Sequence, residues 1–200
     1  MKYSESPNGF PEAVSADPVL TGFRNIHHGK YLHSYELTYR NREQKEKVYE
    51  MVSRKALSAP ADIGRTASGV TIAAVQAGKL LLLREFRMSI NRRIYNLCAG
   101  MLNEGESIEE CAARELMEET GLKVGRFLDI LPASYSAVGF SDVSTHMVFL
   151  EAEGDIHPAP SPDESITAAF YSPAQLEKML RTEVFSSRSQ TVAWMFCRSV

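Results

Sequence analysis

The chain has 200 residues, of which 44% are hydrophobic and 24% are charged, and its net charge is -3. This length suits one domain with a substantial core and a smaller additional element, in an ordinary soluble globular protein. The weak acidity argues against nucleic acid or an anionic membrane as a partner. The three cysteines form no close pair and no metal-ligand spacing, which favours buried free thiols over a disulfide or a zinc site.

The N-terminal quarter of the chain changes character near residue 26. Residues 1 to about 20 are rich in Ser, Pro, Gly and Asn without periodicity, and we assign residues 1–25 to an irregular arm. Within residues 26–58, the alternating stretches KYLHSYELTYR and KEKVYEMVSR flank the turn NREQ and predict an antiparallel β element. No signal peptide opens the chain and no apolar run could span a bilayer, so we expect a cytoplasmic protein without a membrane partner.

Residues 59–200 are expected to form the main domain. Short apolar runs bounded by turn residues predict strands at 69–74, 79–86, 94–98, 127–133, 145–153 and 165–172. Helices are expected from Pro173 to about Leu180 and over 187–197, with one more helix in the centre of the domain. Strands on both sides of a central helix predict a mixed α/β layered domain.

The central helix carries an unusual number of carboxylates. Ser107 followed by Glu110 forms a capping-box signature, and Gly121 supplies a stop. Near the end of the helix, Arg114 is expected to pair with Glu118 at i+4. This single cation cannot neutralise the neighbouring glutamates as well, so the like charges need a further positive partner.

The glutamates of this cluster are Glu115, Glu118 and Glu119, which helical spacing places on neighbouring positions of one surface. Oxygen ligands without histidine or thiolate suit Mg²⁺ or Mn²⁺ better than zinc. Gly100, ahead of the helix, lets the chain turn tightly and bring a backbone carbonyl, that of Ala99, near the cluster. The alternative interpretation is that the carboxylates only form a solvated helix face.

The spacing of the whole stretch favours the metal site. The fixed positions are Gly100, Glu106, Arg114-Glu115-Leu116, Glu118-Glu119 and Gly121-Leu122. This pattern resembles the signature of the Nudix hydrolases at every specified position. The resemblance implies a Nudix fold of the α/β (α+β) class, in which a mixed β-sheet is sandwiched between helices, and a reaction that hydrolyses a nucleoside diphosphate linked to another moiety.

The resemblance also implies roles for the residues of this stretch. Glu115 and Glu119 would be the main metal carboxylates, Glu118 a further ligand, and the Ala99 carbonyl would complete the coordination. Arg114 would orient the glutamates. The ions would bridge the diphosphate and polarise the attacking water.

The stretches LLLREFR and IYNLCAGMLNEGES resemble the ADP-ribose pyrophosphatase-like, nucleotide-sugar branch of the family. The N-terminal strands resemble those through which this branch forms homodimers. Tyr31 and Tyr49 match aromatic residues that stack on adenine, and Arg54 and Arg87 match arginines that bind the phosphates. The expected substrate is therefore ADP-ribose or a related nucleoside diphosphate sugar, cleaved to a nucleoside monophosphate and a sugar phosphate.

The chain departs from the family pattern at two places. Many relatives have Glu and Pro where Asn96 and Cys98 stand, and many carry a catalytic glutamate where Val143 stands. Glu164 is our favoured replacement for this base. Asp142, which we assign to substrate binding, and Glu118 are the other candidates.

Two functions follow from these observations. One is a divalent-metal-dependent pyrophosphatase with Glu164, Glu118 and Arg114 in its catalytic machinery. The other is a catalytically weak or silent Nudix domain that binds ADP-ribose-like ligands as a sensor. The complete set of box carboxylates favours the enzyme, whereas Val143 favours the sensor.

Overall fold

A computed structural model describes residues 17–157 and 166–199. The chain divides into two units. Unit 1 comprises the described residues up to Thr66 together with Tyr135–Val143, and unit 2 comprises Ala67–Ser134 and the described residues from Ser144 onward. The boundary therefore falls later than residue 59, and one segment from far along the sequence belongs to unit 1.

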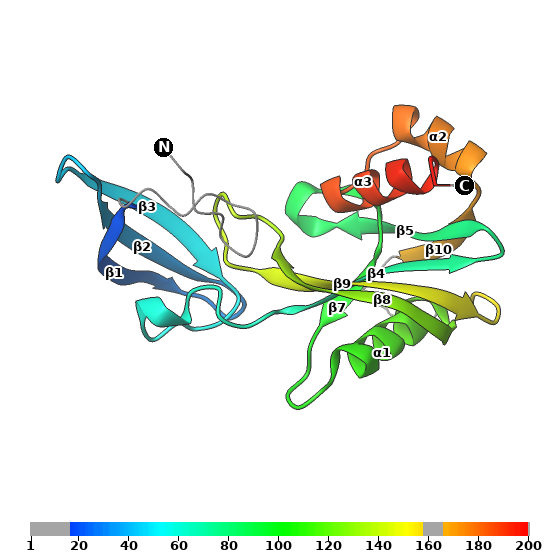
Figure 1. Cartoon of the computed structure of the whole chain (residues 1–200), viewed down its shortest axis with the longest axis horizontal. Helices are drawn as coiled ribbons and strands as arrows, with labels where there is room; N and C mark the ends of the chain where they lie inside the picture. Colours follow the sequence, from blue (N-terminus) through cyan, green and yellow to red (C-terminus); the bar gives the residue numbers. More distant parts are fainter. Residues whose placement is uncertain (1–16, 158–165, 200) are drawn as a thin grey trace, which may run out of the picture. The chain divides into compact units, whose positions relative to one another are not determined.

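Unit 1 contains an antiparallel sheet in the order β1 (Val19–His28), β2 (His33–Arg40) and β3 (Glu46–Ser53) (Figure 1). The 3₁₀ helix η1 (Pro60–Asp62) follows it. On one face of the sheet, Tyr35, Leu37 and Met51 form a small buried core. The predicted antiparallel element is therefore confirmed.

Strand β1 corrects the assignment of residues 1–25 to an irregular arm, because it begins at Val19. Its register against β2 shifts between Leu20 and Gly22 and again between Asn25 and His27. Such bulges interrupt the alternation of inward and outward side chains, so the sequence of this strand lacks the period of two. Residues 1–16 of the expected arm lie outside the described residues.

Unit 2 is built on a seven-stranded mixed sheet in which β4 lies parallel to β9. The sheet has the order β10-β5-β4-β9-β8, with β6 paired to β5 and β7 paired to β4. The strands are β4 (Gly69–Gln76), β5 (Lys79–Arg87), β6 (Arg92–Asn96), β7 (Cys98–Met101), β8 (Lys123–Tyr135), β9 (Ser144–Glu153) and β10 (Ile166–Tyr171). The 3₁₀ helix η2 (Met88–Ile90) joins β5 to β6.

The helices cover both faces of this sheet (Figure 1): α1 (Ile108–Thr120) covers one, and α2 (Pro173–Thr182) and α3 (Ser187–Phe196) cover the other. Along β5, Leu81 and Leu83 join the core beneath α1, while Leu80 and Leu82 join the core beneath α2 and α3. A strand buried on both faces reads as a continuous apolar run, as this one does. The predicted mixed sheet between helices is confirmed.

None of the helices within residues 17–157 and 166–199 is long and apolar enough to cross a membrane.

Candidate active site

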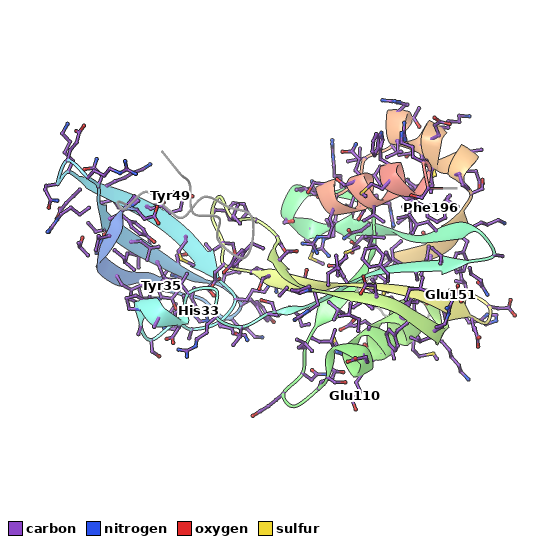
Figure 2. The ribbon with its side chains drawn as sticks, viewed as in Figure 1. His33, Tyr35, Tyr49, Glu110, Glu151 and Phe196 are labelled. Carbon is purple, nitrogen blue, oxygen red and sulfur yellow. The ribbon has the colours of Figure 1, made fainter. Side chains whose placement is uncertain are left out.

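Helix α1 begins and ends as its sequence predicts. The Glu110 amide donates to Ser107 Oγ over 3.2 Å, and the Ser107 amide donates to Glu110 Oε2 over 2.8 Å. Figure 2 labels Glu110 in the first turn of α1. Gly121 closes the helix with a left-handed φ of 78°. These two caps set the bounds of α1 at Ile108 and Thr120.

Gly100 on β7 makes room for the carboxylate of Glu115. A Cβ atom at position 100 would lie 1.7 Å from Glu115 Cδ, so any other residue would displace the Glu115 carboxylate from this position or move the strand. Next to it, the Ala99 amide donates to Glu119 Oε2 over 3.2 Å. The structure therefore brings two glutamates of α1 against the backbone of β7.

Arg114 joins three glutamates of the stretch. Its Nε donates to Glu106 Oε1 over 2.7 Å and its Nη2 to Glu106 Oε2 over 2.9 Å, which is a bidentate pair. Nη1 donates to Glu115 Oε1 over 2.8 Å and to Glu118 Oε2 over 3.2 Å, and the latter is the expected i+4 contact. The Arg114 guanidinium holds the pKa of Glu106 down to about 2, assisted by the hydrogen bond from the Asn103 amide.

The two glutamates at β7 are electrostatically different from Glu106. Burial raises the pKa of Glu119 to about 8, against hydrogen bonds from Cys98 and Ala99, and the charge of Glu115 adds to the rise. Burial also raises the pKa of Glu115, although Arg114 opposes the shift. A carboxylate that is costly to ionise in its site is stabilised by a cation placed next to it.

The predicted donor set consists of oxygen atoms and suits a hard divalent ion. Among the described ranges, no group of three or more His, Cys, Asp or Glu side chains stands ready to hold a metal ion. The predicted ligands are Glu115, Glu119, Glu118 and the Ala99 carbonyl, and oxygen donors of this kind match Mg²⁺ or Mn²⁺. Arg114 contacts two of these carboxylates, Glu115 and Glu118. Their role as ligands stays a prediction.

Two of the predicted substrate-binding residues line one pocket in unit 1. Tyr49 and Asp142 contribute to a pocket of about 520 Å³, whose other lining residues include Leu37, Tyr39, Met51, Tyr135 and Phe140. Figure 2 labels Tyr49 on β3. The Tyr49 hydroxyl donates to the Gly139 carbonyl, and the Gly64 amide donates to Asp142 Oδ2 over 3.2 Å. The segment of residues 135–143 is thus tied to the face of the small sheet.

The remaining predicted residues lie elsewhere. Tyr31 is 68% exposed between β1 and β2, and Arg54 is exposed directly after β3, so neither lines that pocket. Arg87 ends β5 in unit 2. Glu164, the favoured base, lies outside the described residues. The Val143 carbonyl accepts a hydrogen bond from the Ser136 amide over 2.8 Å, within unit 1.

The sequence reasoning missed Glu85, a buried carboxylate on β5. Its charge contributes to the raised pKa of Glu119, so it lies near the predicted metal carboxylates. The run KLLLLREFR could have indicated this position. Alternate residues of a strand point to the same face, so Glu85 lies on the face of Leu81 and Leu83, which α1 covers.

Comparisons with known proteins show a family match and several similar sequences. The NUDIX domain model matches residues 65–195, which is well over half of the chain. An ADP-sugar pyrophosphatase of Mus musculus is 29% identical over 165 residues, covering 76% of this chain and 73% of that protein. An ADP-ribose pyrophosphatase of Bacillus subtilis (strain 168) is 39% identical over 82 residues, covering 41% of this chain and 43% of that protein.

A solved structure described as an ADP compounds hydrolase has the same fold. It superimposes with a TM-score of 0.69 at 19% identity, covering 91% of this chain and 92% of that one. The family match covers the seven-stranded sheet of unit 2, the acidic stretch, α1, α2 and α3 up to its last residue but one. The chain therefore belongs to the Nudix hydrolase family.

Proposed function

We propose that this protein hydrolyses the pyrophosphate bond of ADP-ribose or a related nucleoside diphosphate sugar, with Mg²⁺ or Mn²⁺ as cofactor. The products would be a nucleoside monophosphate and a sugar phosphate. The observation that carries the proposal is the placement of Glu115 and Glu119 against β7, where Gly100 leaves room and burial makes a cation favourable. The named relatives that cleave ADP-ribose or ADP-sugars support the substrate class.

In this proposal, Glu115, Glu119, Glu118 and the Ala99 carbonyl hold the ions. Divalent ions supply positive charge that offsets the charge developing on the diphosphate. Arg114 keeps Glu115 and Glu118 oriented through the contacts described above. A carboxylate removes the proton from the attacking water, and Glu164 is the favoured base, with Glu118 and Asp142 as the alternatives.

The substrate is held by the side chains that the family resemblance assigned. Arg54 and Arg87 bind the phosphates, for which a guanidinium is well suited. Tyr31 and Tyr49 stack on the base. The aromatic pocket that contains Tyr49 and Asp142 supports a role for this region in binding a planar ring. We also propose that the chain acts as a homodimer formed through the strands of unit 1.

The test is release of AMP from ADP-ribose by the purified protein with Mg²⁺, Mn²⁺ or EDTA. We expect hydrolysis only with a divalent ion, and a loss of about 100-fold or more in kcat for Glu119→Gln with binding of ADP-ribose retained. Glu109→Gln, in the first turn of the same helix, is the matched control and should keep full activity. A screen of nucleotide sugars, dinucleotides and nucleoside triphosphates would identify the preferred substrate.

The sensor function is the second candidate, and the valine at position 143 favours it. A sensor would bind ADP-ribose with the same affinity whether or not Mg²⁺ is present, and it would release no AMP. Binding without hydrolysis in the wild-type protein would therefore select the sensor over the enzyme.

A further inference from the structure

Glu85, near the end of β5, is a buried carboxylate outside the predicted metal ligands. Only 7% of the residue is exposed, and it lies on the face of β5 that α1 covers. Burying an ionised carboxylate costs free energy unless other groups donate hydrogen bonds or positive charge to it. The partners of Glu85 therefore indicate what the residue does.

One oxygen of Glu85 is fixed through Asn96 to the beginning of α3. Asn96 Nδ2 donates to Glu85 Oε1 over 2.6 Å. Because a carboxylate only accepts, Asn96 must direct its amide N–H groups to Glu85 and its carbonyl oxygen away from it. That oxygen accepts from Ser186 Oγ over 2.7 Å and from Ser189 Oγ over 2.8 Å. Ser186 is the N-cap of α3 and Ser189 is fully buried, so the amide is held rigidly.

The other oxygen of Glu85 accepts from Arg87 Nη1 over 3.1 Å. Residues two apart in a strand point to the same face, so the pair forms without distorting β5. The side chain of Arg87 is 48% exposed, whereas that of Glu85 is 10% exposed. The buried carboxylate thus anchors one nitrogen of a guanidinium that carries five N–H donors, and the exposed part of the group faces solvent.

We propose that Glu85, fixed by Asn96 and the α3 serines, is a positioning residue that orients Arg87 toward the phosphates of the substrate. This inference rests on the proposed function, because it takes Arg87 as a phosphate-binding residue. Without the anchor, the long side chain of Arg87 would have to be ordered by the substrate itself, and the lost rotamer freedom would weaken binding. A purely structural ion pair would not affect substrate affinity.

A double-mutant cycle between Glu85 and Arg87 tests the proposal. Glu85→Gln keeps an oxygen for the Asn96 amide and the same shape, but it presents a neutral group to Arg87. We expect the Kd for ADP-ribose, measured by calorimetry in EDTA, to rise about tenfold in Glu85→Gln. The KM measured with Mg²⁺ should rise by a similar factor, with a smaller change in kcat. In the Arg87→Ala background, Glu85→Gln should cause no further change.

Glu151→Gln is the matched control, since it breaks a different ion pair of the same sheet, which joins Glu151 on β9 to Arg126 on β8 at 2.8 Å. This variant should leave Kd and KM unchanged. Equal effects of Glu85→Gln in both backgrounds, or an unchanged Kd in a folded variant, would overturn the proposal. If Glu85→Gln does not fold, Asn96→Ala replaces it in the cycle. We expect Asn96→Ala to raise the Kd for ADP-ribose when Arg87 is present and to leave it unchanged in the Arg87→Ala background. An equal rise in Kd in both backgrounds would contradict the proposal.

The outcomes also separate this inference from the proposed function. If the wild-type protein binds ADP-ribose in EDTA but never hydrolyses it, the enzymatic proposal is contradicted. The Kd values of the double-mutant cycle would then still test whether Glu85 orients Arg87. A wild type that hydrolyses ADP-ribose while Glu85→Gln behaves identically contradicts this inference alone. A wild type that does not bind ADP-ribose contradicts both.

Discussion

Arg114 forms a bidentate ion pair with Glu106, and the same guanidinium also contacts Glu115 and Glu118. The pKa of Glu106 is about 2 in the folded chain against an ordinary value of 4.5, so its ionised form stabilises the fold above pH 4.5. This contribution is lost as the pH falls from 4.5 toward 2. We therefore expect Glu106→Gln to lower the melting temperature at pH 7, and the difference from wild type to shrink through that window.

Circular dichroism melts at pH 7, 4.5 and 3 measure this effect. Glu109→Gln in the first turn of the same helix serves as the control, and its difference from wild type should be small at every pH. A difference for Glu106→Gln that stays constant from pH 7 to pH 3 would show that the charge of Glu106 is not what stabilises the fold.

The three cysteines give a second prediction for single residues. Burial raises the pKa of Cys98 well above its usual range and raises that of Cys111 to about 11, and both side chains are buried. Cys197 is partly exposed. Because the thiolate is the reactive form, iodoacetamide at pH 7.5 should label Cys197 first and the other two only in denaturant. Peptide mass spectrometry measures this order, and rapid native labelling of Cys98 would contradict the burial on which the pKa of Glu119 depends.

Among the elements, the packing of α1 against β7 depends on one glycine. Gly100→Ala would place a methyl group 1.7 Å from Glu115 Cδ, so the carboxylate or the strand must move. We expect unfolding free energy to fall by about 1–3 kcal/mol and hydrolysis to fall at least about tenfold. Gly139→Ala is the control for stability, since no atom lies within 4 Å of its added Cβ. Chemical denaturation and activity assays measure the two effects, and a fully active, equally stable Gly100→Ala variant would refute this packing.

The helices and strands also show which parts of the fold could be predicted from the sequence alone. Helix α1 could be predicted with both ends because its cap and its terminal glycine are local signals. The run 94–98 was expected as one strand, whereas β6 and β7 are two strands that pair with β5 and β4. No glycine or proline marks the change at Leu97, since the tertiary pairing causes it.

In the candidate site, too, the local features could be predicted from the sequence and the long-range contacts could not. The acidic cluster and Arg114 follow from spacing within one helix. The raised pKa of Glu119 depends instead on burial beside β7, and the unit 1 pocket requires residues 135–143 to pack on a sheet formed by residues 19–53. Such long-range contacts leave no periodic signal in the sequence. The pairing of Glu85 with Asn96 was predictable only in part. The alternation of side chains along β5 predicts that Glu85 faces α1, but it does not predict that Asn96 is its hydrogen-bond partner.

At the scale of the whole molecule, the proposed homodimer can be tested through the exposed side of the unit 1 sheet. Tyr49 faces the buried side of β3, so the neighbouring Val48 points to the other face, where it is 56% exposed. Exposed apolar residues on a sheet are candidates for burial against a second copy.

We expect light scattering to give about twice the 22.3 kDa of one chain, and Val48→Glu to shift the mass toward one chain. Val184→Glu, at a 45% exposed valine of unit 2, is the matched control and should leave the mass unchanged. A wild-type mass of one chain at all concentrations would exclude the dimer, and activity would then have to come from the residues of a single chain.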